Sequence, residues 1–451
     1  MERYDVVVVG GGPAGVSAAI SAHNTYPNKT IALIRKEKVA LIPCGIPYTQ
    51  HSLESVAADT LPDKLVTEAA GAQLIIDQVM SKSGKTLTLA SGKQVHFDKL
   101  VLATGASPVK PKMEGIELEG IYLCPKCAEA LQQMRDAAQV AKHILIVGGG
   151  YIGVELADEY IKAGKQVTLV EMQDQLLPMT MDPEFGAKAS ELLEQAGAQV
   201  RLGHRVMKFE GNGQVQSATL DDGSIVPAEM VLVCIGARPN VELASQFGLE
   251  YDERAGIRVD EYLRSSQPDI FVIGDSAAKN DFFTGRPSEI RLASTAMAEG
   301  RLVGSNLFEI KVIRKYIGVM GSFATKICGT AFGVSGLTEN RAKEMNLDYR
   351  VGQAITVDRH PGNLPGASPL HLKLIFARYS HVLLGAEVHG GDSVGELVNM
   401  LSVMILNKMT DMDIDTLQIG THPLLTASPI AYPVITATVN AIGKWYQADA
   451  A

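Results

Sequence analysis

Apolar and polar positions in the first part of the chain follow two alternating periods. A continuous apolar run at 6–9 is typical of a buried strand, and the Gly-rich and Ala-rich stretch at 10–23 predicts a turn and a helix. The same order of strand, glycine turn and helix recurs at 143–171, where another apolar strand follows. Strands that alternate with helices are typical of a parallel sheet. The pattern therefore predicts an α/β fold in which one strand–turn–helix unit occurs twice.

The pattern changes beyond residue 315. Apolar and polar residues alternate along four stretches, which predicts the strands of a mostly antiparallel sheet: 321–338, 349–357, 370–378 and 381–390. An amphipathic helix with a Met-rich face is predicted to follow at 393–409. Such a face is more typical of a core or a subunit interface than of a cofactor site.

Length, charge and cysteine content limit the class of protein. A chain of 451 residues exceeds one ordinary domain, since single cores stop growing near about 250–300 residues, so we expect two to three domains. The net charge of −9 and the lack of a basic stripe argue against nucleic acid as a partner. No apolar run reaches the roughly 18 residues that span a bilayer, and the first strand begins too early for a signal peptide. We therefore expect a cytoplasmic protein with no membrane contact, whose five cysteines are reduced thiols.

Each strand–turn–helix unit carries a Gly-x-Gly-x-x-Gly fingerprint. The first glycine allows the tight turn, the second lets the backbone approach a pyrophosphate, and the third lets the helix pack on the strand. The six glycines are Gly10, Gly12, Gly15, Gly148, Gly150 and Gly153. We therefore expect two bound dinucleotides.

The second unit also carries a signal for which dinucleotide it binds. Its last strand ends at Glu171, and no Lys or Arg follows in the next six residues. A carboxylate at this place accepts hydrogen bonds from a ribose 2′-hydroxyl and repels a 2′-phosphate. The site is therefore predicted to favour NADH over NADPH.

Three further apolar strands end at a glycine. These are the strands that lead into Gly105, Gly236 and Gly274. Asp275 follows the last of them, at the carboxyl end of a strand where nucleotides bind. Its carboxylate is suited either to a ribityl hydroxyl or to capping the helix that follows.

Together these motifs resemble the FAD-dependent pyridine nucleotide–disulfide oxidoreductase superfamily over nearly the whole chain. The resemblance implies two Rossmann-like domains, with the NAD domain inserted in the FAD domain, and a C-terminal α+β dimerisation domain. It implies FAD on 1–112 and 243–312, NAD(P)H on 113–242, and an interface domain at 315–451 that completes the partner's active site in a C2 homodimer. The family usually places an acidic residue at the end of the second strand, where this chain has Arg35, with Glu37 two residues further on.

Cys44 lies in the stretch PCGIPY, between two prolines and after the first fingerprint. The glutathione reductase branch closes a CxxxxC disulfide here, but the fifth residue after Cys44 is Thr49. The stretch resembles instead the single-cysteine branch of coenzyme A-disulfide reductases, NADH oxidases and peroxidases, and NAD(P)H-dependent sulfur, polysulfide or persulfide reductases. At a helix start beside a flavin, a thiolate is stabilised and attacks disulfide or polysulfane sulfur, or is oxidised to sulfenic acid by peroxide. Cys44 is therefore the predicted catalytic and flavin-contacting thiol.

The sequence offers one candidate proton donor. Oxidase and peroxidase relatives carry a His in the first glycine loop, where this chain has Pro13. The segment THPLLTAS resembles the His-Pro stretch that supplies a catalytic histidine across the dimer in glutathione reductase, which makes His422 the candidate. The orienting Glu of that family is replaced by Ala427, so a structural capping role for His422 remains the alternative.

Three more residues are assigned by resemblance. Tyr151 matches the tyrosine that covers the flavin until NADH displaces it, and Glu155 matches the residue near the nicotinamide; packing is the alternative for both. Ala293 lies at the start of the helix whose N-terminus faces the flavin ring.

Cys124 and Cys127 form a rival CxxC pair at a predicted helix start. That spacing allows a redox disulfide, an inert pair or, least favourably, half a zinc site, and no metal site is predicted.

The leading hypothesis is electron transfer from NADH through FAD and Cys44 to a low-molecular-weight disulfide, persulfide or polysulfide. The alternatives are an NADH oxidase or peroxidase that reduces O2 or H2O2, a reductase of a protein partner through Cys124 and Cys127, and a redox sensor with negligible turnover.

Overall fold

The computed structural model describes residues 1–314 and 318–449. It divides into two compact units, the first formed by Met1–Lys142 with Met230–Val319 and the second by His143–Glu229 with Met320–Ala451. The predicted bounds of the FAD, NAD(P)H and C-terminal domains stay a prediction. Among the described residues, no helix combines the length and the apolar character needed to cross a membrane.

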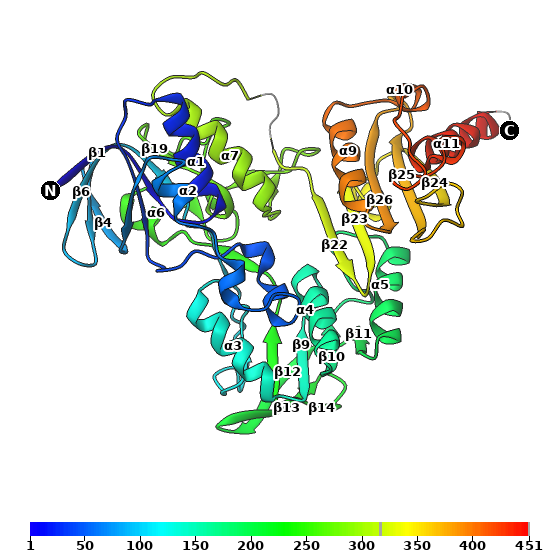
Figure 1. The fold of residues 1–451 in the computed structure, drawn as a ribbon, viewed down its shortest axis with the longest axis horizontal. Helices are drawn as coiled ribbons and strands as arrows, with labels where there is room; N and C mark the ends of the chain where they lie inside the picture. Colours follow the sequence, from blue (N-terminus) through cyan, green and yellow to red (C-terminus); the bar gives the residue numbers. More distant parts are fainter. Residues whose placement is uncertain (315–317, 450–451) are drawn as a thin grey trace. The chain divides into compact units, whose positions relative to one another are not determined.

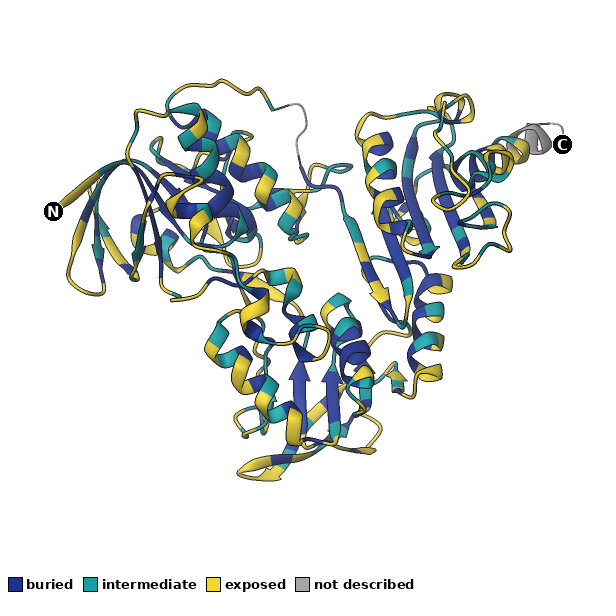
Figure 2. Ribbon diagram, viewed as in Figure 1, coloured by how far each residue is buried: buried dark blue, intermediate teal, exposed yellow. Residues whose placement is uncertain are grey.

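The first unit is built on a sheet of seven strands, in which β19 joins β6 beside the path β3-β2-β1-β6-β5-β4. The strands that pair in parallel are β1 (Glu2–Val9), β2 (Ile31–Arg35), β3 (Gln73–Ile76), β6 (Gln94–Leu102) and β19 (Ile270–Val272). The antiparallel strands are β4 (Val79–Ser83) and β5 (Thr86–Leu89). Continuous apolar runs form β1 and β2 because parallel strands are covered on both faces, and β2 and the second half of β1 are buried (Figure 2).

Two long helices of the first unit, α1 (Pro13–Thr25) and α7 (Ala293–Asn306), pack closely against each other. A Cβ at Gly300 or Gly304 would lie within 3 Å of the backbone of α1, so only glycine allows this approach. The Ser17 hydroxyl donates to the Met297 carbonyl at 2.9 Å, and the Ser21 hydroxyl donates to the Arg301 carbonyl at 2.9 Å. Moving four residues along α1 moves the hydrogen-bonded partner four residues along α7 in the same direction. The helices are therefore parallel, and their N-termini lie at the same end.

Apart from α3 (Ala128–Val140), which is as long as α1, the remaining elements of the first unit are short. The antiparallel pair β7 (Ala106–Pro108) and β16 (Ala237–Pro239) marks the two points at which the chain leaves and re-enters the dinucleotide fold. The other strands are β8 (Ile121–Tyr122), β15 (Met230–Val233), β17 (Tyr251–Asp252), β18 (Gly256–Ile257), β20 (Lys279–Asn280) and β21 (Pro287–Ser288). The other helices are α2 (Lys64–Thr67), α3 (Ala128–Val140), α6 (Glu242–Phe247), η1 (Pro43–Gly45), η2 (Pro47–Gln50), η3 (Val56–Asp59) and η4 (Gly274–Ser276).

The second unit contains the second glycine fingerprint. Its parallel strands β9 (His143–Val147), β10 (Gln166–Glu171) and β11 (Gln199–Leu202) alternate with α4 (Tyr151–Lys162) and α5 (Pro183–Gln195). An antiparallel three-stranded sheet follows, built from β12 (Val206–Asn212), β13 (Gln214–Leu220) and β14 (Ile225–Pro227). The repeated strand–turn–helix unit predicted from the sequence is confirmed.

The C-terminal part of the second unit is a fully antiparallel sheet of order β22-β23-β26-β25-β24 (Figure 1). Its strands are β22 (Ser322–Ile327), β23 (Thr330–Gly336), β24 (Tyr349–Val357), β25 (Pro369–Ala377) and β26 (Leu383–Gly390). One face is covered by α9 (Val394–Leu406) and α11 (Pro433–Asp449), as Gly333 against Val398 and Gly352 against Ala437 indicate. The short helices are α8 (Glu339–Glu344), α10 (Asp411–Asp415) and η5 (Pro429–Ala431). The predicted antiparallel sheet and amphipathic helix are thus confirmed.

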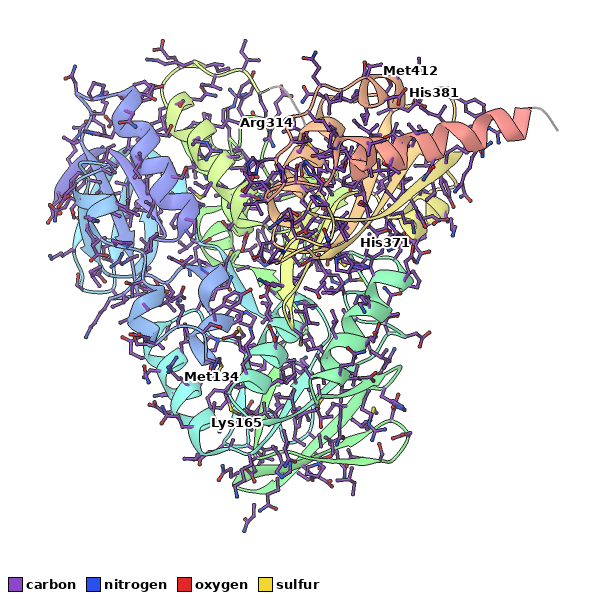
Figure 3. All side chains as sticks on the ribbon, turned by 45° about the vertical axis from the view of Figure 1, so that its right-hand side comes forward. Met134, Lys165, Arg314, His371, His381 and Met412 are labelled. Atoms are coloured by element: carbon purple, nitrogen blue, oxygen red, sulfur yellow. The ribbon has the colours of Figure 1, made fainter. Side chains whose placement is uncertain are left out.

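The opposite face of this sheet packs on helices of the 143–229 segment. His371 (labelled in Figure 3) and His389 both contact the ring of Phe185 in α5, with centroids 5.3 and 5.6 Å away. On the same face, the Lys373 ammonium is 2.7 Å from an Asp182 oxygen and 2.6 Å from a Glu184 oxygen. These contacts join the second glycine fold to the C-terminal sheet within one unit.

Candidate active site

The first glycine loop has the shape that a pyrophosphate site needs. Gly10 has φ +117° and lies directly against the Ala103 carbonyl, while Gly15 lies against the Gly10 carbonyl, so neither position has room for a side chain. Above Gly12 there is open space. Because α1 and α7 are parallel, the positive N-termini that begin at Pro13 and Ala293 lie at the same end of the unit. This arrangement suits a bound anion.

A cavity of about 320 Å³ opens beside the loop. Its lining includes Gly10, Arg35, Glu37, Asp77, Thr104 and Asn240. The Asn240 amide donates to the Thr104 carbonyl at 2.7 Å, so the ends of the two crossover strands form one wall. Gly105 and Gly236, at φ +71° and +106°, make the turns that bring these ends together. The open loop and the polar cavity fit the phosphate and adenosine parts of FAD.

Arg35, at the place where the family carries an acid, is a buried structural residue. Its guanidinium donates to the carbonyls of Glu37 and Lys38 at 2.9 and 2.8 Å, and to the Asp63 carboxylate at 2.7 Å. The residue is 3% exposed, and its guanidinium is engaged in these three hydrogen bonds within the protein. Glu37 lines the cavity, as do the acidic residues Asp77 and Glu242, so acidic side chains other than the one at position 35 are offered at this end.

Gly274 and Asp275 lie in η4, at the end of β19. Gly274, with φ +71°, is close to Ala14 of α1 and Ala296 of α7, and its N–H donates to the Glu299 carboxylate at 2.8 Å. That carboxylate also pairs with Lys279 at 2.7 Å, in an ion pair whose side chains are each 3% exposed. The Asp275 side chain is partly exposed and lies 3.8 Å from the Lys126 ammonium. The Asp275 carboxylate is therefore accessible at the end of the unit where α1 and α7 begin.

Cys44 is exposed and lies in η1, a single 3-10 turn. The sequence predicts a helix start here, and the structure corrects this to a three-residue turn that η2 follows after Ile46. A turn this short has almost no dipole, so η1 does not supply the helix N-terminus that was predicted to stabilise the thiolate. Thr49, where other relatives carry the second cysteine, is buried and donates to the Ile46 carbonyl at 2.7 Å.

Asp59, which sequence reasoning missed, lies against Gly45, the residue that follows Cys44. The chain at 59–61 runs antiparallel to 40–42, with the Ile42 N–H donating to the Asp59 carbonyl at 2.9 Å. The Asp59 carboxyl fills the space where a side chain at Gly45 would lie. It is 2% exposed, its Oδ2 has no hydrogen-bond partner among the described residues, and burial raises its pKa to about 6.

The second glycine loop repeats the geometry of the first. Gly148 has φ +109°, Gly153 lies against the Gly148 carbonyl, and the space above Gly150 is open. Glu171, at the end of β10, accepts hydrogen bonds from the Gly149 N–H at 2.7 Å and from the Gln173 N–H at 2.8 Å. The carboxylate is thus fixed beside the loop, which fits the adenosine ribose of NADH.

Tyr151 and Glu155 follow the loop on successive turns of α4. The Tyr151 ring stacks on Phe323 of β22, with centroids 5.1 Å apart and planes 9° apart. The Thr325 hydroxyl, also on β22, donates to the Glu155 carboxylate at 2.8 Å. Burial raises the pKa of both side chains, that of Glu155 to about 7.

His422 lies in an exposed turn after α10. Its Nδ1 accepts a hydrogen bond from the Leu424 N–H at 3.2 Å, and the Thr426 hydroxyl accepts one from the His422 N–H at 3.1 Å. With Nδ1 as an acceptor, the neutral imidazole carries its proton on Nε2. The Leu424 N–H therefore fixes the tautomer in place of the Glu that the family carries at Ala427.

Cys124 and Cys127 lie where the helix start was predicted, directly before α3. The Cys127 Sγ caps α3 by accepting a hydrogen bond from the Ala130 N–H at 3.5 Å. Cys124 is buried with φ +48°, near Cys234, whose pKa is raised well above its usual range by burial. No disulfide joins any of the five cysteines in the described ranges.

Comparison with known proteins decides the family. The model of the pyridine nucleotide-disulphide oxidoreductases matches residues 4–300, and that of their dimerisation domain matches residues 323–430. The chain belongs to this family. An "NADH oxidase" of Enterococcus faecalis is 31% identical, with 91% of this chain and 93% of the relative covered. A "NAD(P)H coenzyme A polysulfide/persulfide reductase" of Pyrococcus horikoshii is 30% identical over the same shares of the two chains.

A solved structure extends the likeness to the fold. The NAD-dependent persulfide reductase of A. fulgidus aligns with a TM-score of 0.90 and 29% identity, covering 98% of this chain and 84% of the other. The predicted fold class is thereby confirmed, as is the prediction of a flavoprotein oxidoreductase.

Within this oxidoreductase fold, each unit brings one group of predicted residues together. The first unit gathers Gly10, Gly12, Gly15, Gly274, Asp275 and Ala293 around the parallel helix ends. The second gathers Gly148, Gly150, Gly153, Glu171, Tyr151 and Glu155 around α4. Phe323 and Thr325 belong to this second group and were missed, since no local motif links them to α4.

Proposed function

We propose that the enzyme passes electrons from NADH through FAD and Cys44 to a low-molecular-weight disulfide, persulfide or polysulfide. The observation that carries the proposal is an exposed thiol in the PCGIPY turn with Thr49, not cysteine, at the second redox position. The similarity to two persulfide-reducing proteins supports this acceptor class.

The residues of the first unit fit FAD, which supplies a two-electron carrier between a hydride donor and a thiol. Gly10, Gly12 and Gly15 would hold its pyrophosphate, and Asp275 a ribityl hydroxyl. Gly105 and Gly236 shape the crossover wall, and the α7 N-terminus at Ala293 favours negative charge on the ring.

The residues of the second unit fit NADH. Gly148, Gly150 and Gly153 would hold its pyrophosphate, and Glu171 a ribose hydroxyl. Tyr151 and Glu155 would lie at the nicotinamide end. A 2′-phosphate would be repelled by Glu171, so NADPH is the poorer donor.

Cys44 carries the sulfur chemistry in this proposal. Its thiolate attacks one sulfur of the acceptor, a new S–S bond forms, and the acceptor's own S–S bond breaks. The departing thiolate takes up one proton. FAD held by the first unit would supply the two electrons that break the mixed disulfide or persulfide on Cys44, so that the Cys44 thiolate is returned and the second reduced product is released.

The proton donor that we propose is His422 of the partner subunit, in a C2 homodimer formed by the dimerisation domain. The support is the match of residues 323–430 to that domain and the hydrogen bond that leaves the imidazole proton on Nε2. We also propose a cytoplasmic reaction, because a reducing compartment keeps the Cys44 thiol available between turnovers.

Reduction of oxygen or peroxide is the second candidate. It is favoured by the 31% identity to the Enterococcus faecalis NADH oxidase and by the exposure of Cys44, which suits oxidation to sulfenic acid. Pro13, which begins α1, supplies no acid–base group in the loop, which counts against it. The CxxC route is weaker because Cys124 is buried.

The test is anaerobic NADH oxidation with coenzyme A disulfide, polysulfide or a protein disulfide as acceptor, and a separate assay with O2 and peroxide. We expect a small sulfur acceptor to give the highest kcat/KM. Cys44→Ser should remove that turnover, while Cys127→Ser, the matched control, should keep it. Turnover that depends on Cys127, or that is faster with O2 than with any sulfur acceptor, would contradict the proposal.

A further inference from the structure

Two side chains of β22 contact two residues of the nicotinamide end of α4. Phe323 stacks on Tyr151, and the Thr325 hydroxyl donates to Glu155 at 2.8 Å. Tyr151 and Glu155 are four residues apart on the helix, and Phe323 and Thr325 are two apart on the strand. Both spacings place the side chains on a single face. The strand therefore forms a wall along the helix face that begins the NADH site.

The alternation of β22 shows that this contact is a property of the fold. Residues at the odd positions face α4, and Thr325 is buried there. On the opposite face, the Ser322 hydroxyl is 2.8 Å from the Ser402 hydroxyl of α9. Because β22 is an edge strand held between two helices, a one-residue shift would break both contacts.

We propose that Thr325, in the first strand of the dimerisation domain, is a positioning residue that holds the Glu155 carboxylate toward the nicotinamide ring. This inference rests on the proposed NADH site. It gives the dimerisation domain a role in cofactor recognition within its own chain, in addition to forming the dimer.

The Thr325 hydroxyl acts on Glu155 through charge. A hydroxyl that donates to a carboxylate stabilises the ionised form. Burial raises the pKa of Glu155 to about 7, the bond from Thr325 lowers it, and the neighbouring Glu159 raises it. An ionised Glu155 should therefore strengthen binding of the positively charged ring of NAD⁺ relative to binding of the neutral ring of the reduced cofactor.

The other charged groups near this face are already paired. Lys162 bridges Asp158 at 2.8 Å and Glu159 at 3.0 Å on α4. On β22, Lys326 faces away and pairs with Asp392 at 2.6 Å. On the sheet behind, Glu387 lies 3.8 Å from Lys373, and burial raises its pKa well above the usual range. Glu155 is the carboxylate on this face that Thr325 contacts, and the Glu155→Gln variant separates its titration from that of Glu387.

The experiment measures binding and not turnover. The FAD-containing enzyme is titrated calorimetrically with NAD⁺ and with tetrahydro-NAD, a neutral analogue that cannot reduce the flavin, between pH 5.5 and 8.5. The ratio of the two affinities cancels contributions from the phosphates and Glu171. In the wild type we expect the ratio to rise toward NAD⁺ with an inflection near the pKa of Glu155, about 7.

Three variants separate the possible outcomes. Thr325→Val removes the hydroxyl at constant shape and should move the inflection to higher pH by about one unit, because a hydrogen bond to a charged group is lost. Thr325→Ser, the matched control, keeps the donor and should leave the inflection in place.

If Glu155→Gln leaves the pH dependence of the affinity ratio intact, the proposed NADH site is wrong. A different result overturns the role of Thr325. In that result Glu155→Gln abolishes the pH dependence of the ratio, but a folded Thr325→Val variant leaves the inflection at the wild-type pH. Thr325→Ala replaces the Val variant if that variant fails to fold.

Discussion

At the scale of single residues, the site combines positions that a motif specifies with positions that only the fold brings close. Asp59 is of the second kind. Its carboxyl is 2% exposed, lies against Gly45, the residue that follows Cys44, and has a pKa raised by burial to about 6. The turn that carries Cys44 therefore packs on a carboxyl from η3, another turn of the chain.

The raised pKa of Asp59 should make the free energy of unfolding depend on pH in a direction that can be tested. Its folded-state pKa is higher than its unfolded value near 3.9, so the folded state binds more protons between about pH 4 and 6. Stability from this group is present at low pH and lost as pH rises through that window, by about 2–3 kcal/mol. Asp59→Asn should remove this pH dependence, as measured by urea unfolding at pH 4, 5, 6 and 7.

The matched control for Asp59 is Asp348→Asn, at an exposed carboxylate. It should retain the wild-type slope of stability against pH. An Asp59→Asn variant that keeps the same slope would contradict the raised pKa.

Sequence alone could predict the glycines, Glu171 and Cys44, because their signals are local: a fixed spacing after an apolar strand. It could not find Asp59 or Thr325, since each acts through a contact made by a different element. It also placed Cys44 at a helix start, whereas two nearby prolines, Pro43 and Pro47, begin two separate 3-10 turns. Short turns of this kind lack the periodicity by which helices are predicted.

At the scale of elements, the second unit depends on a buried lysine. Lys373, 1% exposed in β25, is within 3.0 Å of oxygens from Asp182, Glu184 and Glu339, and pairing with these carboxylates raises its pKa. The bonds tie the segment before α5 and the start of α8 to the sheet. Sequence alternation predicts the strand, but a lysine on its inner face contradicts the pattern and is found only in the structure.

Removing the lysine should be costly because it leaves buried carboxylates without their partner. We expect Lys373→Met to lower the free energy of unfolding by about 3–5 kcal/mol. Glu184→Gln, which changes a carboxylate that is 41% exposed, should cost less than about 1 kcal/mol. Urea unfolding at pH 7 measures both. Equal stabilities for Lys373→Met and wild type would show that the cluster does not stabilise the unit.

At the scale of the whole molecule, the described C-terminal region leaves large apolar side chains in solvent. Ile430 is 93% exposed and Leu425 is 67% exposed, both in or beside the stretch 323–430 that matches the dimerisation domain. Apolar groups this exposed are typical of an interface. We propose that a second copy of the chain covers these side chains in the dimer.

The dimer is tested by sedimentation equilibrium. Wild type should give about twice the chain mass of 48.2 kDa, and Ile430→Lys should shift the population toward the monomer. Met207→Lys, at an apolar residue that is 56% exposed in β12, should leave the dimer intact. A monomeric wild type, or an unchanged Ile430→Lys dimer, would exclude Ile430 from the interface.

The central claim is that Cys44, and no other thiol, connects the flavin to the acceptor. Anaerobic stopped-flow spectroscopy of Cys44→Ser separates the two half-reactions. NADH should reduce the flavin at close to the wild-type rate, and reoxidation by polysulfide should slow by about two orders of magnitude or more. If the reduced Cys44→Ser enzyme is reoxidised by polysulfide as fast as wild type, Cys44 does not carry the electrons and the account is wrong.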